Sequence, residues 1–132
     1  TYNSLTILLF GEELAPKEVN AALGISATDS FKKGDSFSKG KHLRKNGMWS
    51  LELKREGSSP YDDLRNFADM IPDNFFPLSN IDGVSSARLS LWIDLSDPSS
   101  TIELSIDEPD IELMNKLGVQ FYLTAFPEIA ED

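Results

Sequence analysis

Leu5-Thr6-Ile7-Leu8-Leu9-Phe10 is the longest apolar run near the start of the sequence, and it points to a β-sheet protein. Most of its residues suit strands, and a continuous run of this kind is typical of a strand buried on both faces. Such a strand lies inside a sheet and needs other elements around it. Because 132 residues are the usual size of one domain, we interpret 1–132 as a single domain.

Three helices are expected after this strand, over residues 16–23, 60–71 and 109–117. Each opens with a proline, which suits the first helical position, and the first and third are followed by a glycine, which suits the C-terminal cap. The second has Ser59 as its N-terminal cap, and Pro72 stops it. The side chains expected to face the core are Val19, Ala22, Leu23, Tyr61, Leu64, Phe67, Ala68, Ile71, Ile111, Met114 and Leu117.

A hairpin is expected around Asn46-Gly47, a pair that favours the type I′ turn. Apolar and polar residues alternate after it from Trp49 to Leu53, so one face of that strand is predicted to be buried. A two-residue turn would place Arg44 opposite Trp49. Either the guanidinium then stacks on the indole, or the arm before the turn is bulged or short.

A second, half-buried hairpin is expected from alternation in residues 88–95 and 102–107, joined by a turn at 97–100. Val119 to Phe126 closes the chain as a last strand. Trp92 is out of phase with its apolar neighbours. It lies either under a helix or on an open face with Tyr122 and Phe126.

The predicted order of elements is β-α-β-β-α-β-β-α-β, which makes the fold class α+β with three helices and a mostly antiparallel sheet of about six strands. The first six elements match the ferredoxin-like split order. Residues 72–87 have no clear periodicity, and connections of that length are often functional. This one contains Phe75-Phe76-Pro77-Leu78.

Charge is spread unevenly along the chain. The net charge is −10, with +1 in residues 1–66 and −11 in residues 67–132. Such a field repels long nucleic acids and anionic membranes and attracts basic partners. One basic segment, residues 31–45, carries +5 within this acidic chain. No stretch is long and apolar enough to span a bilayer, so the cytoplasm is the expected compartment.

No catalytic constellation, cofactor motif or metal-ligand set is recognisable in the sequence. The chain has no cysteine, and its one histidine, His42, lies in the basic segment, where we interpret it as a surface or strand residue. Neither a Gly-x-Ser-x-Gly elbow nor a glycine-rich phosphate loop is present. The carboxylates between Asp107 and Glu112 begin a helix, where the helix dipole already explains them. We therefore expect no catalytic residues, no metal and no cofactor.

Several features of the first half resemble a known family. They are Leu23-Gly24-Ile25 at the end of a helix, Thr28, Gly34-Asp35 and the strand with Trp49. Together they are similar to the bacterial domain of unknown function family 4279, mainly over residues 5–55. Ala27 departs from the expected pattern, which has a proline before the threonine. The resemblance implies a small bacterial, cytoplasmic, stand-alone domain and supplies no catalytic residue.

The first functional hypothesis is a non-catalytic protein-binding domain. Small acidic domains without catalytic machinery resemble immunity proteins, which neutralise a cognate toxin by binding it. An acidic inhibitor associates quickly with a basic nuclease-like toxin. The candidate partner-binding residues are Trp92, Asp94, Asp107, Glu108, Asp110, Phe75 and Phe76.

The second hypothesis is a module that binds a small anionic ligand through the basic segment. Its candidate ligand-binding residues are Lys32, Lys33, Lys39, Lys41 and Arg44. Neither hypothesis fixes the oligomeric state.

Overall fold

A computed structural model describes residues 4–53, 59–95 and 103–126. Within them, five strands form the main sheet, in the order β2-β5-β1-β6-β7, and two short strands form a separate ribbon. The strands are β1 (Ser4–Gly11), β2 (Asp29–Phe31), β3 (Ser36–Phe37), β4 (His42–Leu43), β5 (Gly47–Glu52), β6 (Ser86–Asp94) and β7 (Val119–Phe126). The helices are α1 (Pro16–Leu23), α2 (Pro60–Met70) and α3 (Glu108–Leu117), with 3-10 turns η1 (Asp73–Phe75) and η2 (Leu78–Asn80).

The strand order confirms the ferredoxin-like prediction. β1 is central and pairs antiparallel with both β5 and β6, while β2 pairs antiparallel with β5. The path β1-α1-β2-β5-α2-β6 is therefore the split βαββαβ arrangement. α3 then crosses over to β7, which lies parallel to β6 and ends the sheet. The fold is α+β, with one parallel pair in a mostly antiparallel sheet.

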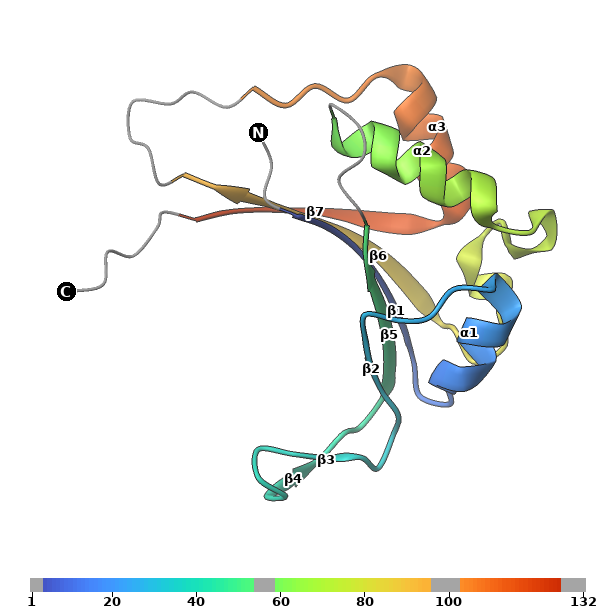
Figure 1. The fold of residues 1–132 in the computed structure, drawn as a ribbon, viewed down its shortest axis with the longest axis vertical. Coiled ribbons are helices and arrows are strands. Elements are labelled where there is room, and N and C mark those ends of the chain that lie inside the picture. Colours follow the sequence, from blue (N-terminus) through green and yellow to red (C-terminus); the bar gives the residue numbers. More distant parts are fainter. Residues whose placement is uncertain (1–3, 54–58, 96–102, 127–132) are drawn as a thin grey trace.

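All three helices pack on one face of the sheet, and no helix of the described chain lies over the other face (Figure 1). This arrangement corrects the prediction for β1. Its residues alternate between buried and half-buried, so Leu5, Ile7 and Leu9 face the helices while Leu8 and Phe10 face the open side. A continuous apolar run therefore does not mark a strand covered on both faces here. We call the helix-free side the open face.

The helix predictions are confirmed. Ser59 Oγ accepts a hydrogen bond from the N–H of Asp62 at 3.3 Å, and α1 and α3 both end at a glycine with left-handed φ. The predicted inward side chains of α2 are buried. Ile111 of α3 is the exception: 46% of its surface is exposed. No helix in the described part of the chain is long and apolar enough to cross a membrane.

The hairpin predicted at Asn46-Gly47 is wrong. A type I′ turn needs positive φ at both residues, and neither has it. β4 pairs with β3 instead, and β5 pairs with β1 and β2. Arg44 therefore does not stack on Trp49, because the residues before Asn46 belong to the β3–β4 ribbon and not to a hairpin with β5. Gly47 is a glycine for a different reason: a Cβ there would lie 2.6 Å from the carbonyl oxygen of Leu14.

The second predicted hairpin is also not formed. β6 pairs with β1 and β7, and residues 103–107 form no strand. Leu104 and Ile106 are nevertheless half-buried and pack against the core, which explains the alternation that predicted a strand. The turn predicted at 97–100 lies outside the described residues.

Candidate functional site

The seven predicted partner-binding residues do not share one surface. Trp92 and Asp94 lie on the open face of β6, whereas Phe75 and Phe76 lie at η1, on the helical side. Phe76 is half-buried, and the ammonium of Lys116 lies 4.7 Å from its ring centre. Asp107 and Glu108 are exposed at the start of α3. The predicted residues therefore divide among the open face of β6, the η1 turn and the start of α3.

Asp110 is buried, with 5% of its surface exposed, and does not contribute a surface carboxylate. The guanidinium of Arg65 donates to Asp110 on α3 and to Asp62 on its own helix. The hydrogen bond to Asp62 contributes most, and that to Asp110 adds to it, so the pKa of Arg65 is raised above its usual range. Burial, with the nearby Asp110 and Asp107 carboxylates, also raises the pKa of Tyr61, whose hydroxyl has no hydrogen-bond partner in the described chain. Asp110 therefore joins α2 to α3.

Trp92 lies on the open face, which is the second of the two alternatives left by the sequence. It is 42% exposed, and its ring meets that of Phe126 edge-on at 6.1 Å. On the same face of β6, the guanidinium of Arg88 lies 4.1 Å from the ring centre of Tyr122 and 5.1 Å from that of Phe10. Tryptophan, tyrosine and arginine are the residue types most enriched at binding hot spots.

The cations of the basic segment differ in their surroundings. Arg44 stacks on Phe31 and Phe37, at 4.0 and 4.1 Å from their ring centres. Lys33 Nζ donates to Glu12 Oε1 at 2.6 Å. Lys32, Lys39 and Lys41 are exposed. Two of the five predicted anion ligands therefore have partners within the chain.

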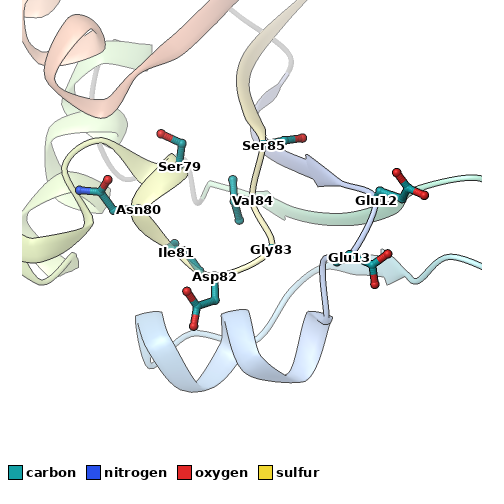
Figure 2. A pocket seen from close by; sticks show the side chains of 9 residues that line it. All are labelled: Glu12, Glu13, Ser79, Asn80, Ile81, Asp82, Gly83, Val84 and Ser85. Atoms are coloured by element: carbon teal, nitrogen blue, oxygen red, sulfur yellow. The ribbon is translucent and has the colours of Figure 1, made fainter.

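An open hollow of about 390 Å³ lies where β1 ends and β6 begins (Figure 2). We call it the acidic hollow, because its charged lining residues are Glu12, Glu13 and Asp82. The carboxylates of Glu12 and Glu13 lie on one side of Gly83 and that of Asp82 on the other (Figure 2). The remaining lining residues are Ser79, Asn80, Ile81, Gly83, Val84 and Ser85.

Two glycines determine the shape of the acidic hollow. A Cβ on Gly11 would lie 1.7 Å from the carbonyl oxygen of Gly83, so the two backbones approach more closely than any side chain permits. Gly83 also has φ +85°, a conformation that other residues rarely adopt. The close approach brings residues 12 and 13 beside residues 79–85, which are distant in the sequence.

Glu12 already binds an ammonium group at the edge of the hollow. The hydrogen bond and the charge of Lys33 lower the pKa of Glu12, and the same contacts raise the pKa of Lys33. Both side chains are at least half exposed, so the pair is screened by water and salt.

A second hollow, of about 310 Å³, adjoins the first and shares three of its residues. It adds Glu18 and Ala22 from α1 and Phe75 from η1. The apolar periodicity and the composition of the sequence do not indicate that the residues of the two hollows lie together, because their acids are dispersed between residues 12 and 82. The sequence features that could have pointed to this site are Glu12-Glu13, directly after β1, and Asp82-Gly83, shortly before β6.

The sequence pattern of a family described as a domain of unknown function, DUF4279, matches residues 1–125. The chain belongs to this family. The match extends the resemblance seen over residues 5–55 to nearly the whole chain. Comparison with curated proteins gives no match, and comparison with solved structures gives none.

The described part of this DUF4279 domain holds no group of three or more histidine, cysteine, aspartate or glutamate side chains placed to share a metal ion. His42 is exposed on the β3–β4 ribbon, where its ring lies 5.5 Å from that of Phe37. The arrangement around the two hollows offers carboxylates, amide and hydroxyl groups and one aromatic ring. These groups are suited to receiving basic side chains.

Proposed function

We propose that this DUF4279 domain is a non-catalytic, immunity-type inhibitor that neutralises a basic bacterial toxin by binding it at the acidic hollow. An inhibitor of this kind protects the cell that makes it, so the compartment we propose is the cytoplasm. The observation that carries the proposal is the Glu12–Lys33 contact, in which a carboxylate of the hollow already holds a lysine ammonium at 2.6 Å.

The charges around the hollow support a basic partner. Glu13, Glu18 and Asp82 are exposed, and within the described residues none of them forms an ion pair of the kind that Glu12 makes. Exposed carboxylates on a chain of net charge −10 attract a cationic surface and speed its association. Toxins that act on nucleic acids carry such surfaces, because their substrate is polyanionic.

The neighbouring hollow supplies the apolar contact that affinity needs. Phe75, one of the predicted anchors, lines it beside Glu18 and Asp82. Charged groups steer and select a partner, while a desolvated aromatic contact slows its dissociation. A basic side chain with an apolar stem, such as lysine or arginine, can satisfy both requirements at once.

The test is an affinity capture from the native host with tagged protein at low and moderate salt, read by quantitative mass spectrometry. It compares the wild type with the Glu13→Gln/Glu18→Gln/Asp82→Asn variant. We expect the wild type to retain one stoichiometric basic protein that weakens with salt, and the variant to lose it.

The matched control is Asp107→Asn/Glu108→Gln/Glu112→Gln, which also removes three negative charges, here from the exposed start of α3. It should retain the partner. Loss of the partner from this control but not from the hollow variant would assign binding to the C-terminal acids instead. Capture of no basic protein by the wild type at either salt would refute the proposal.

A further inference from the structure

Exposed apolar side chains gather at one side of the molecule. Of seven large exposed hydrophobic residues in the described chain, five lie on or directly after β6, on β7 or on α3. They are Trp92, Leu95, Ile111, Tyr122 and Leu123. β6 and β7 are neighbours in the sheet, and α3 packs against β7. Trp92 and Tyr122 lie on the open face and Leu123 on the helical face, so apolar side chains are exposed on both faces of this edge of the sheet, as is common where another chain binds.

β7 is the strand at this edge of the sheet, and its sequence has none of the usual protection. Val-Gln-Phe-Tyr-Leu-Thr-Ala-Phe contains no charged residue, proline or glycine over eight residues. Natural proteins blunt exposed edges with lysine, proline or bulges, because a bare edge pairs with other strands. The opposite edge is different: β2 has only three residues and begins with Asp29.

The backbone of β7 has hydrogen-bonding groups directed away from the sheet. The carbonyl oxygen of Phe126 accepts from the N–H of Leu95, so the backbone of Phe126 is directed toward β6. Backbone groups alternate in direction along a strand, which turns those of Phe121, Leu123 and Ala125 outward. No strand of the described chain pairs with these outward groups, because the sheet ends at β7.

We propose that β7 pairs antiparallel with β7 of a second copy of this chain, joining two sheets into one. The edge is neutral, so what complements it is an uncharged, apolar strand, and β7 is itself such a strand. A twofold axis perpendicular to the sheet brings no like charges opposite each other within the pair. Tyr122 would meet the second copy on the open face and Leu123 on the helical face.

The acidic hollow and this edge are separate surfaces. The hollow is built from residues 12–13 and 79–85, and β7 contributes none of its lining. A basic partner would find no carboxylate on β7 to pair with. The dimer therefore does not rest on the proposed inhibitor function, and either can fail alone.

The β7–β7 dimer and the complex with a basic partner should respond to salt in opposite directions. Two chains of net charge −10 repel each other, and salt screens that repulsion, so the dimer should strengthen as salt rises. A complex with a basic partner should weaken under the same change.

The experiment is sedimentation velocity of the purified chain across a dilution series at low and moderate salt. We expect a reversible monomer–dimer equilibrium that shifts toward dimer with salt. Leu123→Lys should raise the dimer dissociation constant by about tenfold or more, because it adds a charge to an apolar contact. The control is Leu43→Lys, the same change at a 64% exposed leucine on β4, and it should leave the equilibrium unchanged.

Hydrogen exchange on the wild type gives a second reading that needs no variant. The amides of Phe121, Leu123 and Ala125 should exchange slowly in concentrated solution and quickly on dilution. A chain that stays monomeric at every concentration would overturn the proposal. So would a dimer that Leu123→Lys leaves intact, or outward β7 amides whose exchange does not depend on concentration.

Discussion

Asn20 is the residue through which α1 binds both β5 and the loop before β2. Its side-chain oxygen accepts from Trp49 Nε1 on β5 at 2.7 Å and from the N–H of Ala27 at 3.1 Å. Trp49 is fully buried, so its indole N–H has to be satisfied inside the protein. The second contact gives Ala27 a role: a proline at that position, as the family resemblance led us to expect, would lack the N–H that Asn20 receives.

Asn20→Ala should therefore destabilise the domain. Both donors lose their acceptor, and an unsatisfied buried donor costs about 1–3 kcal/mol. The measurement is urea unfolding followed by fluorescence in a Trp92→Phe background, where Trp49 is the one remaining tryptophan. Asn66→Ala is the matched control, since Asn66 is exposed on α2 and the same helix-propensity gain applies. Equal stability of the two variants would contradict this role for Asn20.

Helices are predictable from this sequence because their ends carry local signals. Proline at the first turn and glycine after the last turn depend on the conformation of a few adjacent residues, and such signals predict α1, α2 and α3. Strand partners depend on residues far away. Gly47 has the local pattern of a turn residue, although it lies opposite Gly11 and against Leu14 in the folded sheet. No residue close to position 47 in the sequence indicates those contacts.

The element that most limits sequence reasoning is α3, whose acids the sequence explains only as residues that complement the helix dipole. Asp110 is instead buried between α2 and α3, where Arg65 holds it. Arg65→Gln should destabilise the domain by about 1–3 kcal/mol, because it leaves a buried carboxylate without its cation.

Asp62→Asn is the control for this pair of helices. It removes the other carboxylate that Arg65 contacts, but Asp62 is partly exposed and its pair with Arg65 spans only one helical turn. Such pairs contribute about 0.5 kcal/mol or less. Chemical denaturation of both variants tests the assignment, and a loss for Asp62→Asn as large as that for Arg65→Gln would contradict it.

At the scale of the molecule, the strand pairing of β1 with β6 creates the candidate site. Phe10 lies opposite Ser86 in that pairing, which brings the residues after β1 beside the residues before β6. The sequence pattern predicts both strands but pairs β6 with residues 102–107. The candidate acids chosen from the sequence follow charge density in the C-terminal half and do not include Glu13, Glu18 and Asp82, which line the two hollows and are dispersed in the sequence.

The excess of acids has a consequence for the whole fold. A net charge of −10 on one small domain opposes compaction, because like charges are held closer in the folded state than in the unfolded chain. Salt screens this repulsion, and it also weakens exposed ion pairs such as Glu12–Lys33. The repulsion should dominate, since exposed pairs contribute little to stability.

Raising NaCl from low to physiological concentration should therefore increase the Tm, by about 2–5 °C for a change near 1 kcal/mol in a domain of this size. Thermal unfolding of the Leu123→Lys variant at low concentration tests this without a contribution from dimer formation. The same salt series at pH 4.4 is the control. The sequence pI is about 4.4, so the net charge is small there and the salt effect should largely disappear. A Tm that falls with salt at pH 7 would mean that the attractive ion pairs outweigh the repulsion among the acids.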